Sequence, residues 1–188
     1  MCGRYNFSTD IQDEKMTALM SVMERKYPGK YKTGDIFPGD TAPAMIARDD
    51  KIVPVPAAFG FPGFQDGKLL INARGETAAA KKTFADSLRE RRAILPATGF
   101  YEWSADKTKY LFTLDATSVF YLCGLYKVID GIHRFVILTR AANASMIEIH
   151  DRMPVIVGEH QVRAYLTDTI AASEIIANAA PILTKQEA

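Results

Sequence analysis

Four strand-like segments follow one another between residues 93 and 139 with no helix between them, and this succession constrains the fold most. They read AILPATGFYEW, KYLFTLD, VFYLCGLYKV and HRFVILT, are rich in β-branched and aromatic residues, and are bounded by turn residues. Strands that follow strands favour an antiparallel sheet over the alternating strands and helices of a doubly wound fold. We therefore predict an α+β fold with a mostly antiparallel, barrel-like β core and flanking helices.

The rest of the chain supplies shorter strands and the helices. A first helix is predicted from near Ile11, capped by Thr9 or Asp10, and ended by Pro28-Gly29. Residues 34–43, GDIFPGDTAP, are expected to form a loop. The other predicted helices are Thr77–Arg91, Asn143–Ile149, Gly158–Leu166 and Ser173–Ala179, and the other predicted strands are Ala44–Ala47, Ile52–Phe59, Leu69–Ile71 and residues 154–157.

The size and composition predict one soluble domain, residues 1–188, acting as a monomer in the cytoplasm and near the nucleoid if the source is bacterial. The chain has 188 residues, 48% of them hydrophobic, without an apolar run long enough to cross a membrane, so no membrane partner is expected. Two cysteines form no disulfide framework and suit a reducing compartment. The net charge of +1 gives no overall attraction for nucleic acid, so a DNA contact requires a local basic surface.

Cys2 stands directly behind the initiator methionine. If Met1 is removed, Cys2 carries an α-amine with a pKa near ~7.7–8.0 and a thiol near ~8.5. With an aldehyde, the amine forms an imine and the neighbouring thiol then closes a five-membered thiazolidine, which no internal cysteine can do. Intramolecular closure of this kind has a high effective concentration. The alternative is that Cys2 serves only as a small apolar residue.

Two further residues could move protons. Glu102 lies between Tyr101 and Trp103, where an apolar setting would raise its pKa and suit it to proton transfer; the alternative is an alternating strand in which Glu102 faces solvent. His150, expected at the end of a short helix, is followed by Asp151, which could orient the ring; the alternative is a capping histidine.

The segment INARGET places Asn72, Arg74 and Glu76 two residues apart, behind the apolar end of a strand. One face of a strand would then present a carboxamide and a guanidinium together, whereas the alternative is a loop that starts a helix at Glu76 or Thr77. No CxxC, HxxxH, glycine-rich phosphate loop or GxSxG occurs, so the sequence predicts neither a metal site nor a cofactor.

Taken together and in this order, MCGRY, INARGET, GFYEW and IHDRMPVI resemble the SOS-response-associated peptidase (SRAP) family, the abasic-site processing proteins. The resemblance spans residues 2–157 and implies the family's barrel-like fold. It also implies that Cys2, freed of Met1, forms a thiazolidine crosslink with the ring-opened aldehyde of an abasic site in single-stranded DNA. The peptidase name would then refer to the processing that exposes Cys2.

The resemblance implies a role for each matching residue. Asn72 would position the N-terminal residue and the sugar, Glu102 would assist proton transfer during imine formation, and His150 would move protons at the opened sugar and support reversal. The DNA-binding positions it implies are Arg4, Arg74, Pro38 and Trp103. Arginine contacts to phosphate are independent of sequence, which suits a damage sensor.

Several features depart from the family pattern or leave alternatives open. Asp35 stands where an asparagine is common and would repel phosphate, Phe59 replaces a tryptophan, and the C-terminal segment is short. The residues KKTFADSLRERR could extend a DNA groove or form a solvated helix face, and Phe59, Phe61 and Phe64 could stack on bases or pack in the core. The alternative functions are a hydrolase with Cys2 as nucleophile and His150 as base, and a noncovalent single-stranded DNA-binding module.

Overall fold

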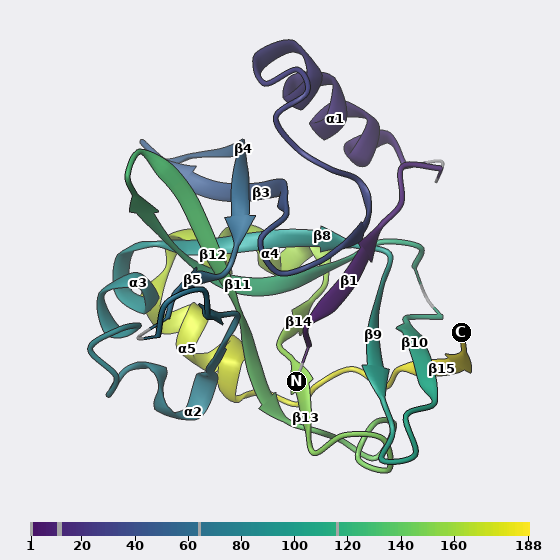
Figure 1. The fold of residues 1–188 in the computed structure, drawn as a ribbon. Coiled ribbons are helices and arrows are strands. Elements are labelled where there is room, and N and C mark those ends of the chain that lie inside the picture. Colours follow the sequence, from purple (N-terminus) through teal and green to yellow (C-terminus); the bar gives the residue numbers. More distant parts are fainter. Residues whose placement is uncertain (1, 11–12, 64, 116) are drawn as a thin grey trace.

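The structure, a computed structural model, describes residues 2–10, 13–63, 65–115 and 117–188 and contains two main sheets with helices around them (Figure 1). Its strands pair mostly antiparallel, and helices flank them, so the predicted α+β class is confirmed. Among the described residues, no helix is both long and apolar enough to cross a membrane.

The first sheet has five antiparallel strands. Its order is β15 (Thr184–Glu187), β10 (Lys109–Thr113), β9 (Gly99–Trp103), β1 (Arg4–Phe7) and β2 (Gly34–Ile36). β1 is therefore flanked on both sides, with Arg4 opposite Tyr101 and Asn6 opposite Asp35. The prediction of a loop over residues 34–43 is wrong at β2, because pairing with β1 holds this short segment extended, and at residues 41–43, which pair with β4 as the start of β3.

The second sheet closes on itself as a ring. Its ring strands are β12 (Ile132–Ala141), β4 (Lys51–Phe59), β3 (Thr41–Arg48), β8 (Arg92–Ala97) and β11 (Phe120–Ile129), and β11 returns to pair with β12. The strands β13 (Arg152–Pro154), β14 (Ile156–Val157) and β7 (Asn72–Arg74) extend this sheet. Strands β5 (Phe61–Pro62) and β6 (Leu69–Leu70) form a small separate pair. The ring agrees with the expected closed β core.

Strand β12 organises the ring because each of its edges changes partner along its length. On one edge it runs parallel first to β4 and then to β7, and on the other it pairs antiparallel first with β11 and then with β13. Its middle residues, 135–139, are fully buried, as expected for a strand covered on both faces. β12 therefore brings Asn72, through β7, and the residues next to His150, through β13, to neighbouring positions.

The first helix, α1 (Glu14–Lys26), starts later than predicted. Its N-cap is Asp13, whose side chain accepts hydrogen bonds from the backbone N–H groups of Lys15 and Met16. Thr9 and Asp10 precede this cap, and Ile11, the predicted first residue, lies outside the described residues. The predicted end before Pro28-Gly29 is confirmed.

The other helices differ more from expectation. The predicted helix over residues 77–91 is divided into α2 (Gly75–Ala78) and α3 (Ala85–Glu90), and residues 144–149 form turns rather than a helix. Helix α2 packs against β7 and β12, and α3 packs against β8 and β11. Helices α4 (Glu159–Thr167) and α5 (Thr169–Ala177) agree in type with the prediction, and the predicted strand over residues 154–157 is divided between β13 and β14.

The interior resolves the open question about two of the phenylalanines. Phe59 is 0% exposed and stacks on Phe135 with ring centroids 4.9 Å apart, and Phe61 is also buried. Both therefore pack in the core, and the suggestion that they stack on bases is wrong. Phe64 lies outside the described residues. Arg92, the last residue of the basic segment, is also buried and cannot line a groove.

Candidate active site around Cys2

Cys2 lies fully buried just before β1. Its relative exposure is 0%, and its Sγ lies 3.9 Å from the carbonyl oxygen of Arg4 as a weak donor. Because β1 is an inner strand of the five-stranded sheet, two ladders of hydrogen bonds fix the strand that Cys2 precedes by two residues. Met1 lies outside the described residues.

Asn72 holds the backbone of Cys2 directly. Its Nδ2 donates to the carbonyl oxygen of Cys2 at 3.1 Å and to that of Ile137 at 3.4 Å. Its Oδ1 is buried and accepts no hydrogen bond from the part of the chain that the structure describes. Asn72 therefore joins the first residues to the ring and still has an acceptor for another group.

Glu102 points to the interior rather than to solvent. It is 4% exposed, whereas the next residue, Trp103, is 37% exposed. The alternative in which an alternating strand turns Glu102 to solvent is wrong, because β9 lies inside the sheet and its inward face covers the site. A buried carboxylate beside Cys2 is the arrangement that proton transfer requires.

The electrostatics connect Cys2 with its neighbours. Burial raises the pKa of the Cys2 thiol well above its usual range, and the negative charge of Glu102 raises it further. Burial likewise raises the pKa of Tyr5, and a charge on Cys2 would act in the same direction. The thiol is therefore held neutral at physiological pH.

Arg4 and Trp103 lie on the face of the five-stranded sheet that is opposite to the face carrying Glu102. Arg4 is opposite Tyr101 in the ladder, so Glu102 alternates to the other side. The Cζ atom of Arg4 is 4.2 Å from the ring centroid of Phe37, 5.0 Å from that of Trp103 and 5.9 Å from that of Tyr101. Phe37 and Trp103 are both partly exposed, so this face offers a cation between aromatic rings.

The remaining DNA-binding candidates lie at the surface. Pro38 is exposed in the turn between Phe37 and Asp40, and Arg74 is exposed at the end of β7. Asp35, which departs from the family pattern, accepts hydrogen bonds from Asn6 at 2.7 Å and from Tyr101 at 3.1 Å. Part of its carboxylate is therefore already engaged by protein donors.

His150 follows the turns of residues 144–149, so the expected stabilisation by a helix C-terminus is wrong. Its Nδ1 accepts a hydrogen bond from the backbone N–H of Arg152 at 2.9 Å and lies 3.0 Å from Oδ1 of Asp151. The predicted contact with Asp151 thus exists, although the Asp151 side chain is 80% exposed and the interaction is screened by solvent.

Sequence analysis missed an ion pair that joins the segment following Asn72 to the segment following His150. Arg152 donates from Nη1 and Nη2 to the two carboxylate oxygens of Glu76 at 2.7 and 2.8 Å. Both residues lie close in sequence to predicted site residues: Glu76 is four residues after Asn72, and Arg152 is two residues after His150. No spacing rule, however, indicates that these two segments meet in the fold.

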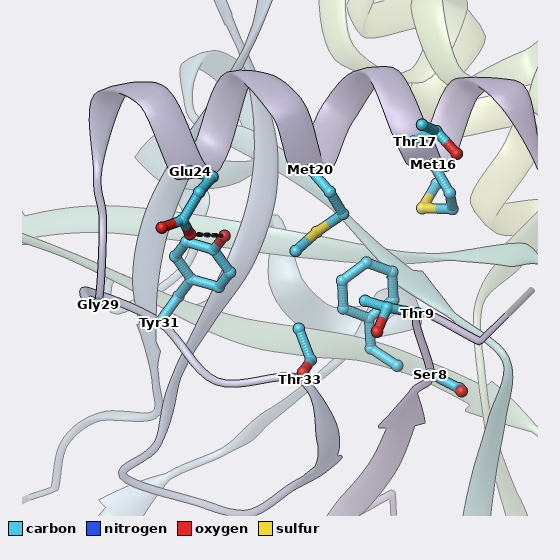
Figure 2. A pocket seen from close by; sticks show the side chains of 10 residues that line it. Ser8, Thr9, Met16, Thr17, Met20, Glu24, Gly29, Tyr31 and Thr33 are labelled. Atoms are coloured by element: carbon cyan, nitrogen blue, oxygen red, sulfur yellow. Dashed lines mark hydrogen bonds between the residues drawn. The ribbon is translucent and has the colours of Figure 1, made fainter.

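A separate cavity of about 470 Å³ lies between α1 and the start of the chain (Figure 2). Methionine and aromatic side chains form its apolar part, and at one end Tyr31 donates to Glu24 at 3.1 Å. None of the predicted site residues lines it. Within the described ranges, no three His, Cys, Asp or Glu side chains gather as metal ligands.

Comparison with known families explains the arrangement. The profile of the family described as SOS response associated peptidase (SRAP) matches residues 1–187. This protein belongs to the SRAP family. Its fold is similar to that of a phage-related protein from Bordetella bronchiseptica, with a TM-score of 0.76, 23% identity and coverage of 100% of this chain and 94% of that one.

SRAP relatives that are similar in sequence carry a common description. The abasic site processing protein YedK of Escherichia coli is 30% identical over 95% of this chain and 86% of its own. The abasic site processing protein YoaM of Bacillus subtilis is 35% identical over 87% of this chain and 67% of its own. The family resemblance inferred from four short motifs is therefore confirmed.

Proposed function

We propose that this SRAP protein processes abasic sites in DNA by forming a covalent link between Cys2 and a ring-opened abasic site in single-stranded DNA, after removal of Met1. The names of YedK and YoaM support the first part of this proposal. The link would shield the lesion during repair. Exposure of Cys2 by self-processing of the N-terminus belongs to the same proposal.

The observation that carries the proposal is the hydrogen bond from Asn72 to the carbonyl oxygen of Cys2. It fixes the backbone of residue 2 while leaving the amine and thiol to react. The Oδ1 atom of the same Asn72 side chain is available to accept a hydrogen bond from the Cys2 amine or from a sugar hydroxyl. Fixing the reacting groups in this way is worth several orders of magnitude in rate.

The chemistry takes two steps. The Cys2 amine adds to the C1′ aldehyde carbon of the opened sugar, and the resulting carbinolamine loses one water to give an imine. The thiol then adds across the C=N bond, so that sulfur bonds to C1′ and the thiol proton is transferred to nitrogen. The product is a thiazolidine, and the net change is loss of one water with no oxidation or reduction.

The raised pKa of the Cys2 thiol determines which of these two steps comes first. A neutral thiol is a weak nucleophile, so the amine attacks first and the thiol reacts only when the adjacent imine is present. Glu102, buried beside Cys2, can protonate the leaving hydroxyl of the carbinolamine, recover a proton as the imine forms, and relay the thiol proton to nitrogen during closure. His150 would act at the opened sugar and in reversal.

The cysteine hydrolase alternative receives less support from the same site. A hydrolytic cysteine needs a lowered thiol pKa and a base that forms the thiolate. Here burial and Glu102 both raise the pKa of the Cys2 thiol.

DNA would approach over the face that carries Arg4 and Trp103 and reach Arg74 and Pro38 at the surface. The exposed Trp103 and Phe37 can stack on bases, while Arg4 and Arg74 can neutralise phosphates. Because these contacts read the backbone and the ring faces, they are independent of base sequence.

A denaturing gel tests the proposal. Protein lacking Met1 is mixed with single-stranded DNA that carries one abasic site, beside intact DNA, and the experiment is repeated with Cys2→Ala. We expect a heat-stable shifted band for the wild type on abasic DNA alone, and none for Cys2→Ala.

Mass spectrometry defines the outcome further. The crosslinked mass should equal protein plus DNA minus one water. Absence of the band with folded, processed protein, or a band of equal intensity formed by protein that retains Met1, would contradict the proposal.

A further inference from the structure

We infer that Glu76 is a positioning residue, which acts through Arg152 to fix the orientation and tautomer of the His150 ring. The inference rests on the proposed function, because that function gives His150 its role at the opened sugar. Neither Glu76 nor Arg152 needs to touch the reacting atoms for this role.

The first step is the ion pair itself. Two parallel hydrogen bonds of 2.7 and 2.8 Å join the guanidinium of Arg152 to the carboxylate of Glu76. The Arg152 side chain is only 12% exposed, and its Nη2 also lies 3.4 Å from Oγ1 of the buried Thr139. A bidentate pair of this kind fixes direction as well as distance.

The second step connects this pair to the ring. The backbone N–H of Arg152 donates to Nδ1 of His150 at 2.9 Å. Since a hydrogen bond to Nδ1 requires its lone pair, the neutral ring carries its proton on Nε2. The ring then presents Nε2–H as a donor, which suits stabilisation of an oxygen on the opened sugar.

The third step is the anchor of Glu76. Its Oε1 also accepts from the backbone N–H of Ala141, at the end of β12, at 3.2 Å. The helix that carries Glu76 begins at Gly75, where an added Cβ would lie 2.6 Å from Cγ2 of Ile176, so α2 packs tightly against α5. Glu76 is therefore held by the ring and by a helix, and it is four residues from Asn72.

Asp151 is the competing candidate for this role. Its Oδ1 lies 3.0 Å from the same Nδ1, but this contact becomes a hydrogen bond only if Nδ1 carries the proton. One nitrogen cannot both accept from Arg152 and donate to Asp151. The Asp151 side chain is 80% exposed, whereas the Arg152 side chain is largely buried, so we assign the dominant contact to Arg152.

The test measures the tautomer of the His150 ring directly. In ¹⁵N-labelled protein, long-range proton–nitrogen correlation at alkaline pH distinguishes the two neutral tautomers, and the chain has only three histidines to assign. The wild type should show mainly the Nε2–H tautomer at His150. Glu76→Gln should lower the tautomer ratio about tenfold and slow crosslinking about tenfold, as is typical when a group that orients a functional histidine is lost.

The matched control is Glu148→Gln. Glu148 also carries an ion-paired carboxylate close to His150 in sequence, but its side chain is 76% exposed and pairs with Lys185. This variant should leave both the tautomer ratio and the crosslinking rate within about twofold, since exposed pairs contribute little. Glu76→Asp, which keeps a shorter carboxylate, should fall between wild type and Glu76→Gln in both measurements.

The outcomes are distinct. An unchanged tautomer ratio in folded Glu76→Gln, or in Glu76→Asp if the first variant does not fold, overturns the inference. A change of ratio in Asp151→Asn but not in Glu76→Gln also overturns it and assigns the role to Asp151. If wild-type protein forms no crosslink, the proposed function fails, while the tautomer measurement still decides whether Glu76 positions the ring.

Discussion

The two cysteines are equally buried, yet their surroundings differ in kind. Cys2 and Cys123 are both 0% exposed, and burial raises the pKa of each thiol. Around Cys2 lie the carboxamide of Asn72 and the carboxylate of Glu102. Cys123 lies within β11 opposite Ile94, and its backbone N–H donates to the carbonyl oxygen of Val155 at 2.9 Å.

The difference teaches that burial alone does not mark a reactive cysteine. Both thiols are held neutral, but Cys2 has beside it a carboxamide and a carboxylate that could bind a substrate and move its protons. The region around Cys123 is devoted to stability instead. We therefore expect substitutions near Cys123 to alter the free energy of unfolding, and substitutions near Cys2 to alter the crosslinking rate.

The largest expected effect is on the Cys123 side. Arg92, on β8 near Cys123, donates to the carbonyl oxygens of Tyr165 and Leu166 in the last turn of α4 and of Leu88 and Arg89 in the last turn of α3. Arg92→Leu should lower the free energy of unfolding by about 3–5 kcal/mol, because four carbonyl acceptors, two in buried and two in partly buried hydrogen bonds, lose their donor. Urea denaturation measures this loss.

Arg89→Leu is the control for Arg92. Arg89 forms exposed ion pairs with Asp86 and Glu90, so the free energy of unfolding should not change measurably. The folded fraction of Arg92→Leu should crosslink at the wild-type rate. A slower rate in that fraction would show that Arg92 also affects the site around Cys2, and would contradict the separation of the two regions.

The next effect is on the Cys2 side. Asn72→Ala removes the donor to the Cys2 carbonyl and should slow crosslinking about 100-fold, equivalent to about 2.7 kcal/mol in the barrier, because the reacting residue is displaced. Its free energy of unfolding should fall by only about 1 kcal/mol. Single-turnover kinetics on abasic DNA measure the rate.

Asn143→Ala provides the comparison for Asn72. Asn143 also donates from Nδ2 to backbone carbonyls, at 2.8 Å to Pro181 and 3.3 Å to Ala180. It should lose similar stability without a change in rate. Equal rates for Asn72→Ala and Asn143→Ala would show that the bond to Cys2 has no role in the chemistry.

The two cysteines themselves should respond in opposite ways. Cys123→Ser places a hydroxyl in an apolar strand and should lower the free energy of unfolding by about 2 kcal/mol while the crosslink band persists. Cys2→Ser should abolish the heat-stable band, since no thiol remains to close the ring. A stable band from Cys2→Ser would contradict the assignment of the thiol.

The smallest effect concerns pH. The hydrogen bonds from Arg152 lower the pKa of Glu76 from 4.5 to about 2. Since the folded pKa is depressed, this group stabilises the fold above pH 4.5 and its contribution is lost as pH falls towards 2. The Glu76 side chain is 49% exposed, so the contribution should be about 0.5 kcal/mol after screening.

Acid titration of stability measures this contribution. Compared with wild type, Glu76→Gln should show a shallower decline of the free energy of unfolding between pH 4.5 and 2. Parallel curves for the two proteins would show that the ion pair does not contribute to folding.

The sequence predicted the main strands because their β-branched and aromatic residues act locally. Residues 93–139 formed strands as expected, and four motifs were enough to identify the family. The strand at residues 34–36 was missed because only its pairing with β1 makes it a strand. The helix predicted at residues 143–149 was wrong because side-chain bonds, such as that from Ser145 to Asn143, favour turns.

The sequence named candidate site residues but not how their side chains are oriented. The structure places Asn72 on Cys2, yet sequence alternation alone favoured an exposed Glu102, because the sheet that covers it is made by strands distant in the chain. The ion pair between Glu76 and Arg152 was unpredictable for the same reason. It depends on β7 and β13 pairing with opposite edges of β12.

The central place of β1 has a mechanical consequence. If DNA is attached at Cys2, a force on the DNA enters the protein at the end of a strand flanked by β2 and β9. Such a force along the strand loads both ladders in shear, so several hydrogen bonds must break together rather than one after another. A crosslink at Cys2, if it forms as proposed, would therefore resist a pulling force through two ladders at once.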